Sequence, residues 1–339
     1  LQKEQNFRQG PVPRSVVSIH PIVVPGFEEL KLFEVAAQSD GRCVAITTRL
    51  ETVSWHIENL LHDDSSGRSS SRSRKSVRAS SPALAAGEGA QVRIYPVSGL
   101  EHIAISTVAC GRNHTIALSC AGGVYGWGSN ARGQLGRPSS TDGESGGGHA
   151  AGASAIDLGR GTYCRLVTCG DDHTLVLAYN SVVGQQQLLA CGAADLGQLG
   201  LGGEYTSLLS SSMLPVNFPP TSASSLEEIP AVSMESDLLV ATIAAGGDSS
   251  FCLTESGVAF AWGDNRCGQL GLGDTEAYHA PTAIQSFLDV GLKVETISCS
   301  GKCSAAVSTA GNVYTWGQIR AEVNGTKIDG GGGGGGGGG

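Results

Sequence analysis

A repeated sequence unit constrains the fold of this chain more than any other feature. The unit reads "VACGRNHTIALSCAGGVYGWGSNARGQLG" at 108–136 and recurs at 167–200 and 243–274. Weaker copies occupy 297–318 and 35–56. If Cys110, Cys169, Ala245 and Cys299 are taken as equivalent points, the successive intervals are 59, 76 and 54 residues. Self-similarity at a spacing of this order is the sequence signature of a fold assembled from stacked repeats.

The tryptophans test whether the repeat is real. The chain has four, and every one occupies the same register of its copy, while Cys191 takes that place in the remaining copy. The four are Trp55, Trp127, Trp262 and Trp316. Because chance would not place all four there, we treat the repeat as a structural unit.

Each unit contains short alternating segments separated by turn residues, which is typical of antiparallel strands. In the copy that begins at 105, "ISTVAC" leads through Gly111 into "HTIALS", and the turn "AGG" leads into "VYGWG". Three or four strands in some fifty residues form a unit of propeller-blade size. A single blade leaves both faces of its sheet uncovered, so radial stacking of neighbours must supply the core. We therefore predict an all-β protein with a β-propeller fold.

The Trp-Gly pair and the "GQLG" string are assigned structural roles in this prediction. The indole is expected to fill the space between blades, and the adjacent glycine is expected to let backbone approach closely. "GQLG" is expected to form the turn that sends the chain to the next blade. The residues in these roles are Trp55, Trp127, Gly128, Gly133, Gly136, Gly197, Gly200, Trp262, Gly263, Gly268, Gly271, Trp316 and Gly317.

The pattern "CGxxHT…L…G.VY.WG.N..GQLG" resembles the repeat of the regulator of chromosome condensation family, which also occurs in HECT-type ubiquitin ligases and in a plant ultraviolet photoreceptor. The resemblance covers roughly residues 20 to 318, with two interruptions. It implies a seven-bladed propeller, whereas about five units are recognisable here. Either the chain holds an incomplete seven-bladed ring, or two blades have diverged beyond recognition.

Two segments interrupt the period. Residues 59–92 contain "SSGRSSSRSRKSVRASSP" at 65–82, in which positions 65–81 hold nine Ser and five basic residues, and this composition predicts a disordered insertion. The segment 210–236 is rich in Pro and Ser and is predicted to be a loop. The predicted organisation is an N-terminal flank at 1–19, propeller repeats at 20–318 with insertions at 59–92 and 210–236, and a tail at 319–339 that ends in poly-Gly 330–339.

Composition excludes several classes of function. The net charge of -9 repels nucleic-acid phosphates, so only the basic insertion at 65–82 could offer a contact with nucleic acid. No run of some eighteen apolar residues occurs, so no membrane association is expected. Ten Cys without a secretory signal predict reduced thiols and a cytoplasmic or nuclear location.

No enzyme signature occurs in the sequence. "GQLGLGD" has neither the P-loop pattern nor the glycine spacing and following helix of a dinucleotide site. The C-x-x-x-H pairs Cys110–His114 and Cys169–His173 lie in different copies, which a propeller holds apart, so four zinc ligands would not converge. We interpret these Cys as small buried strand residues and these His as partners of local backbone. No catalytic, metal-binding or cofactor-binding residue is predicted.

Binding to a protein partner is the remaining class of function. The equivalent loops "GRNH", "GDDH", "GGDSS" and "SGKC" are candidate contact loops because recognition residues are usually carried by loops on a rigid scaffold. The candidate residues are Asn113, His114, Asp171, Asp172, His173 and Asp248. The first hypothesis is a non-enzymatic interaction platform that serves as a regulatory or adaptor protein.

Two alternatives follow from the resemblance. In the founding member of the family, exchange of guanine nucleotide on a small GTPase depends on an acidic residue directly before the repeat His, and Asp172 matches that position. A plain solvated aspartate that caps a turn is the competing interpretation of Asp172. The third hypothesis is a regulatory repeat module of a larger HECT-type ubiquitin ligase.

Overall fold

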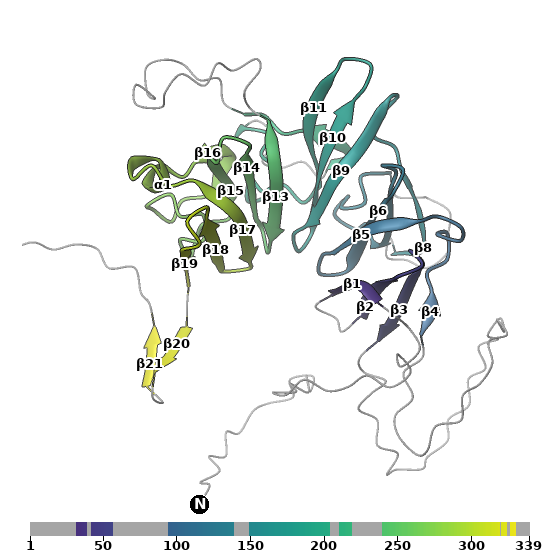
Figure 1. Ribbon diagram of the computed structural model, residues 1–339, viewed down its shortest axis with the longest axis horizontal. Coiled ribbons are helices and arrows are strands. Elements are labelled where there is room, and N and C mark those ends of the chain that lie inside the picture. Colours follow the sequence, from purple (N-terminus) through teal and green to yellow (C-terminus); the bar gives the residue numbers. More distant parts are fainter. Residues whose placement is uncertain are drawn as a thin grey trace, which may run out of the picture.

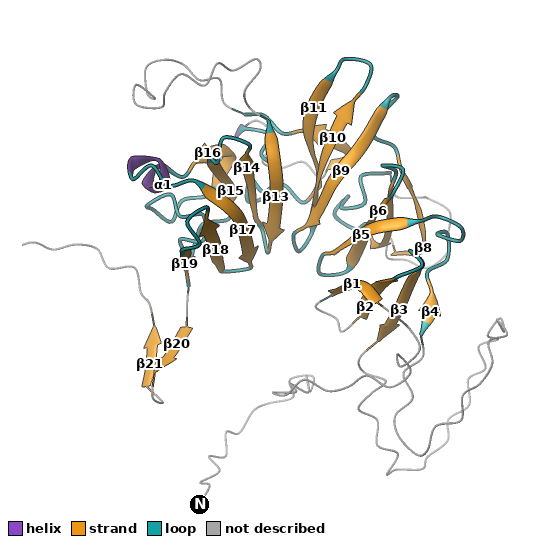
Figure 2. Ribbon diagram, viewed as in Figure 1, coloured by secondary structure: helices purple, strands orange, loops and turns teal. Residues whose placement is uncertain are grey.

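The computed structural model describes residues 32–38, 42–56, 94–138, 149–203, 210–218, 239–318, 320–323 and 326–329. Within these ranges nearly all regular structure is strand, and the one helix is α1 (Gln285–Asp289) (Figure 2). The predicted all-β class is confirmed.

The strands form five successive antiparallel sheets, which we call blades A to E. In blades A to D four strands pair in chain order, and blade E has three. Blade A contains β1 (Leu32–Ala37), β2 (Arg42–Thr47), β3 (Thr52–His56) and β4 (Tyr95–Pro96), and blade B contains β5 (Ile105–Cys110), β6 (His114–Ser119), β7 (Val124–Ser129) and β8 (His149–Ile156). Blade C contains β9 (Thr162–Cys169), β10 (His173–Asn180), β11 (Gln185–Gly192) and β12 (Ser210–Pro215).

Blade D contains β13 (Val240–Gly246), β14 (Ser249–Thr254), β15 (Ala259–Gly263) and β16 (Tyr278–Ala283), and blade E contains β17 (Val294–Ser300), β18 (Cys303–Ser308) and β19 (Val313–Gly317). A separate hairpin of β20 (Arg320–Val323) and β21 (Thr326–Asp329) follows.

The five blades lie along an arc in the order of the sequence (Figure 1). The first strand of each blade contacts the first strand of the next, as β5 contacts β9 and β13 contacts β17. Apolar clusters fill the spaces between blades, and we call these spaces seams. Each of the four seams has a cluster of its own, centred on Ile46 and Ala117, on Ile116 and Val176, on Leu175 and Trp262, and on Phe251 and Ile297. Five recognisable blades with their core between the sheets are therefore confirmed.

Two details differ from the sequence predictions. Strand β12 begins at Ser210, inside the segment 210–236 that was predicted to be a loop, so that part of the prediction is wrong. Its Met213 and Leu214 pack against two different seam clusters, which explains why the chain is extended there. Outside the described residues lie the remainder of that segment, at 219–236, and the predicted insertion 59–92 with its basic part 65–82.

The "GQLG" turn also lies at a different place in the blade. Gly268–Gly271 connects β15 to β16, which belong to the same sheet, so the turn leads to the outermost strand of its own blade and not to the next blade. The same holds for Gly197–Gly200, which lies between β11 and β12. The contacts of this turn nevertheless reach the next blade.

Candidate functional site

The glutamine of each "GQLG" turn fastens its blade to the following one. In the seam between blades C and D, the backbone carbonyl of Gln198 accepts a hydrogen bond from Ser250 Oγ at 2.8 Å and another from Trp262 Nε1 at 3.0 Å. The next seam repeats this arrangement with Gln269, Ser304 and Trp316. Between blades B and C the donors to the carbonyl of Gln134 are Thr174 Oγ1 and Cys191 Sγ. Trp262 and Trp316 therefore each bond the preceding blade through the indole N–H.

The last glycine of the turn makes room for the indole. Gly200 has φ +67°, and a Cβ there would lie 2.9 Å from Trp262 Nε1. Gly271 has φ +74°, and a Cβ there would lie 2.8 Å from Trp316 Nε1. The glycine after the tryptophan register has a different neighbour. At Gly263 a Cβ would meet the carbonyl oxygen of Asp248, in the loop of the same blade, at 2.3 Å.

The two repeat histidines belong to the seams. His114 Nε2 lies 3.0 Å from Thr174 Oγ1, and His173 Nε2 lies 2.8 Å from Ser250 Oγ. Because Thr174 Oγ1 donates its hydrogen to the carbonyl of Gln134, it accepts from the histidine, which fixes the hydrogen on Nε2. Burial lowers the pKa of His114 to about 4 and that of His173 to about 3, so both rings are neutral near pH 7.

This arrangement corrects two sequence interpretations. His114 and His173 were candidates for partner contact, but both are 0% exposed and cannot reach a protein on the surface. They were alternatively expected to bond local backbone, and instead they bond side chains of the following blade, about 60 residues or more away. Their role in this structure is to join blades.

The loops before β6, β10, β14 and β18 form one continuous row. Arg112 N donates to the carbonyl of Asp171 at 2.9 Å, and Asp171 N donates to the carbonyl of Gly247 at 2.7 Å. The first two of these loops are therefore each held by a backbone hydrogen bond to the loop of the next blade. We call the surface formed by loops 111–113, 170–172, 247–248 and 301–302, with the adjoining "GQLG" turns, the loop face.

Three aspartates, Asp171, Asp172 and Asp248, lie on the loop face together with the cations Arg112 and Lys302. Asp171 forms an ion pair with Arg112, and Asp172 lies 3.7 Å from the same guanidinium. Burial raises the pKa of Asp248, and repulsion from Asp171, Asp264 and Asp172 raises it further. The neighbouring carboxylates are thus close enough to disfavour the charge of Asp248.

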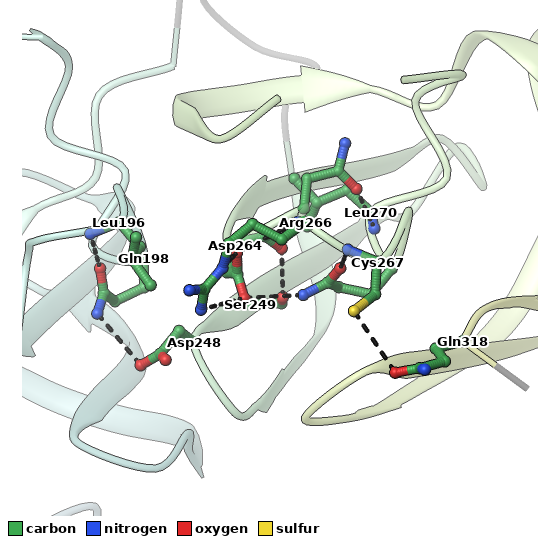
Figure 3. Close-up of polar contacts among 11 residues, drawn as sticks. Leu196, Gln198, Asp248, Ser249, Asp264, Arg266, Cys267, Leu270 and Gln318 are labelled. Carbon is green, nitrogen blue, oxygen red and sulfur yellow. Dashed lines mark hydrogen bonds and ion pairs between the residues drawn. The ribbon is translucent and has the colours of Figure 1, made fainter. Parts of the chain in front are cut away.

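The seam glutamines also position these carboxylates. Gln134 Nε2 donates to Asp172 Oδ1 at 3.4 Å, and Gln198 Nε2 donates to Asp248 Oδ1 at 3.3 Å (Figure 3). One glutamine therefore bonds the next blade's seam through its main chain and the next blade's loop through its side chain. Asp172, with 26% of its side chain exposed, is neither a fully solvated aspartate nor a buried one.

The pattern changes at blade E, where Lys302 takes the place of the loop aspartate. Gln269 Nε2 there donates to Asp264 Oδ2 of its own blade at 3.1 Å. Burial works to raise the pKa of Asp264, but hydrogen bonds and charge from Arg266, together with a hydrogen bond from Gln269, outweigh burial and lower it (Figure 3). Asp264 therefore stays ionised to a lower pH than Asp248 does.

Of the six predicted contact residues, four lie at the loop face with partly exposed side chains: Asn113, Asp171, Asp172 and Asp248. Sequence reasoning missed Arg112, Asp264 and the three glutamines. The glutamines carried a usable signal, since a turn that needed only glycines would have no reason to repeat Gln three times in "GQLG".

In the part of the chain that the structure describes, no group of three or more His, Cys, Asp or Glu side chains is placed to hold a metal ion. Nor does any helix found there have the length and apolar character needed to cross a membrane.

Comparison with known proteins agrees with this architecture. The Regulator of chromosome condensation (RCC1) repeat matches residues 256–307, and a second form of that repeat matches 105–134 and 240–269. Similar solved structures include Prp20p from Saccharomyces cerevisiae, with TM-score 0.58 and 18% identity over 86% of this chain and 59% of that one. Human WBSCR16 gives TM-score 0.58 and 20% identity over 86% of this chain and 62% of that one.

Curated relatives cover about two thirds of the chain. The probable E3 ubiquitin-protein ligase HERC6 from Homo sapiens is 32% identical over 67% of this chain and 19% of its own length. The ultraviolet-B receptor UVR8 from Arabidopsis thaliana is 30% identical over 65% of this chain and 43% of its own. Human protein RCC2 is 27% identical over 65% of this chain and 41% of its own. The chain thus spans less than half the length of these relatives.

Fold and seams together define a β-propeller assembled from sequence repeats, a class that serves as an interaction or regulatory module. Within that class the chain belongs to the family of RCC1-repeat proteins.

Proposed function

We propose that this chain is a non-enzymatic interaction platform, a regulatory or adaptor module, that binds a protein partner with its loop face. The observation that carries the proposal is the gathering of Asp171, Asp172 and Asp248 on one rigid surface, where burial, and then repulsion from the other aspartates, raise the pKa of Asp248 although Arg112 lowers it. Folding would not keep like charges together for stability alone, since their repulsion is unfavourable. A partner that presents basic side chains would relieve it.

The loops of this face are also pre-organised. Backbone hydrogen bonds link loop to loop, as between Asp171 and Gly247, and the seam glutamines hold Asp172 and Asp248. A surface that is ordered before binding loses little conformational entropy on association. The net charge of -9 disfavours nucleic acid as a partner.

The test compares variants on the two ends of the blades. Proteins that co-purify with the chain are identified, the candidates are purified, and their Kd is measured for the wild type, for Asp171→Asn/Asp248→Asn, and for Glu255→Gln. Glu255 is an exposed control, because it lies in the β14–β15 turn at the end of blade D opposite to the loop face. We expect a Kd at least about tenfold higher for the loop-face variant and an unchanged Kd for Glu255→Gln. The Kd of the wild type should also rise at high salt, because salt screens the charges of its loop face. Equal affinities for all three proteins would contradict the proposal.

The second candidate is a guanine-nucleotide exchange factor for a small GTPase, supported by Asp172. Its carboxylate stands directly before the repeat His and is 26% exposed at the loop face. The structure of Prp20p, which has a similar fold, was described together with its binding properties to Gsp1p and histones. Release of a fluorescent nucleotide from a panel of small GTPases tests this function, with Asp172→Ala as the variant and Glu255→Ala as the control. If the wild-type chain accelerates release from none of them, exchange activity is refuted.

The third candidate, a repeat module of a larger HECT-type ubiquitin ligase, is supported by the 32% identity with HERC6, of which this chain covers 19%. A HECT segment in the full-length transcript would support it, and a transcript without one would refute it. For location we propose the cytoplasm or nucleus, because thiols such as those of Cys169, Cys191 and Cys252 form no disulfide and such thiols persist in reducing compartments.

A further inference from the structure

The seam between blades A and B differs from the other three. In those three, the carbonyl that joins the blades belongs to a "GQLG" turn between the third and fourth strands of the preceding blade, at Gln134, Gln198 and Gln269. The corresponding connection in blade A spans residues 57–94, between β3 and β4, and its sequence contains no "GQLG". Blade A therefore has no turn of this sequence to offer to blade B.

Blade B nevertheless carries the pair of side chains that holds such a carbonyl elsewhere. Thr115 and Trp127 lie directly opposite each other on β6 and β7, as Ser250 and Trp262 do on β14 and β15. Ser250 and Trp262 both donate to the carbonyl of Gln198. Among the residues that the structure describes, none accepts a hydrogen bond from Trp127 Nε1. The donor pair is thus present in this seam without the acceptor it has in blade D.

A buried acceptor without a donor lies at the same place. Gln38, in the β1–β2 loop, is only 8% exposed, and its Nε2 donates to Thr115 Oγ1 at 2.6 Å. Its Oε1 is buried and has no hydrogen-bond partner. The hydroxyl hydrogen of Thr115 is left with Cys110 Sγ, 3.6 Å away, and sulfur is a weak acceptor. Because buried polar atoms are normally paired, this combination needs an explanation.

The unpaired groups define what chemistry would fit. Trp127 Nε1 and the Thr115 hydroxyl require an acceptor, whereas Gln38 Oε1 requires a donor. A carboxylate offers only acceptors. A main-chain peptide group offers both a carbonyl oxygen and an N–H, and the other seams show that a glycine-rich turn can bring its carbonyl to such a donor pair.

The place is continuous with the loop face. When antiparallel strands pair in chain order, the connection between the first two strands and that between the last two lie at the same end of the sheet. Trp127 is near that end, two residues before the end of β7, and its side chain is partly exposed. A protein that contacts the loop face can therefore also reach this indole.

We propose that the loop-face end of the seam between blades A and B is a peptide-binding site. A turn of a partner protein places a main-chain carbonyl on Trp127 Nε1 and Thr115 Oγ1 and an N–H on Gln38 Oε1. The partner thereby supplies the kind of turn that blade A lacks. The site binds through neutral hydrogen-bonding groups and not through the aspartates of the proposed function, so either proposal can fail while the other holds.

The first measurement asks whether this chain already fills the site. The full chain is labelled with ¹⁵N-tryptophan, its indole signals are assigned with Trp→Phe variants, and exchange of each indole N–H with water is followed by NMR. Trp262 is the control, because its Nε1 is bonded and its side chain is 0% exposed. We expect the N–H of Trp127 to exchange at least ~10-fold faster than that of Trp262. Equal protection would overturn the proposal, because a group of this chain, such as one in the connection 57–94, would then be the acceptor.

The second measurement adds a probe peptide. Its sequence is "AADLGQLGLG", residues 193–202 of this chain, with acetylated and amidated ends. We expect the indole N–H signal of Trp127 to move downfield and its exchange to slow, while a peptide of the same composition in scrambled order has no effect. If the Trp127 signal does not respond to the "GQLG" peptide, the proposal is overturned.

The third measurement assigns the binding to the indole. The Kd of the fluorescein-labelled peptide is determined by anisotropy for the wild type, for Trp127→Phe and for Trp262→Phe, after thermal unfolding has shown that each variant folds. Trp127→Phe removes the donor and should raise Kd at least ~3-fold. Trp262→Phe should leave Kd unchanged, since that indole lies in another seam. Equal Kd values for the wild type and Trp127→Phe would refute the proposal.

Discussion

The seam between blades C and D predicts a large difference between two glycines that look alike in the sequence. Gly200 and Gly202 both belong to "GQLGLGG" and both have positive φ, +67° and +87°. A Cβ at Gly202 would meet nothing within 4 Å, whereas one at Gly200 would lie 2.9 Å from Trp262 Nε1. The indole cannot move aside without lengthening its 3.0 Å hydrogen bond to the carbonyl of Gln198. We therefore expect Gly200→Ala to be much more destabilising than Gly202→Ala.

The magnitude follows from two separate costs. Alanine in the left-handed region is less stable by about 1–2 kcal/mol, and this cost applies to both variants. Overpacking of a buried contact adds about 1–3 kcal/mol, and this cost applies only to Gly200→Ala. The free energy of unfolding should therefore fall by roughly 1–2 kcal/mol for Gly202→Ala and by roughly 2–5 kcal/mol for Gly200→Ala. Urea unfolding followed by tryptophan fluorescence and far-ultraviolet circular dichroism measures both.

A double-mutant cycle identifies the indole as the source of the difference. Phenylalanine has no atom at the position of Nε1, so Gly200→Ala should cost less in a Trp262→Phe background than in the wild type, while the contact with Val216 Cγ1, also 2.9 Å from the added Cβ, remains. The next seam offers a replicate, since a Cβ at Gly271 would lie 2.8 Å from Trp316 Nε1 and one at Gly273 would meet nothing within 4 Å. If Gly200→Ala and Gly202→Ala prove equally destabilising, or if the cycle is additive, the seam argument is wrong.

Two further predictions concern buried titratable groups. The folded-state pKa of His173, about 3, lies below the unfolded value of ~6.5, so the folded chain binds fewer protons and its stability is lost as pH falls below ~6.5 towards that pKa. His173→Gln should flatten this loss of stability with pH, because Gln38 already makes the corresponding bond to Thr115 in another seam. Urea midpoints of the variant and the wild type across that pH range measure the effect. Parallel pH curves for the two proteins would contradict the assignment. Burial raises the pKa of the Cys191 thiol to about 12, whereas Cys120 is exposed, so a thiol reagent should modify Cys120 first and leave Cys191 untouched until unfolding. Modification of Cys191 in the folded chain would refute this.

The repeat predicted the blades and the tryptophan seams because both depend on local pattern. Alternation of apolar residues specifies strands, and a large apolar side chain at one register specifies what must be covered. The partners in the seams could not be predicted in this way. The hydroxyl that His173 bonds belongs to Ser250, 77 residues away, and no spacing within one repeat indicates which residue of the next blade will lie opposite.

The longer β10–β11 hairpin could have been predicted from the sequence, but only by counting the residues between equivalent repeat positions and not by matching motifs. Gly128, Gly263 and Gly317 each follow the repeat position at 114, 249 or 303 by 14 residues, whereas Gly192 follows His173 by 19. Five additional residues between paired strands either lengthen the hairpin or enlarge its turn. Only the structure distinguishes the two, because the bonds of Asn180 and Ser181 that close the longer hairpin depend on Thr162 and Gly161 of a third strand.

The glutamine of "GQLG" explains why stability and the proposed binding function are coupled in this fold. Its main-chain carbonyl joins two blades, so the distance between adjacent loops is set by the seam. Its side-chain amide then fixes the aspartate of the next loop, as Gln198 fixes Asp248. Where Lys302 replaces that aspartate, Gln269 keeps its seam bonds and turns its amide to Asp264 instead. The seam bond is therefore kept whichever residue the next loop carries, and the charge of the face is free to vary from blade to blade. A loop face of this kind can acquire a new specificity by substitution of loop residues without loss of the fold, and the cluster of Asp171, Asp172 and Asp248 is the surface that we propose this chain presents to a partner.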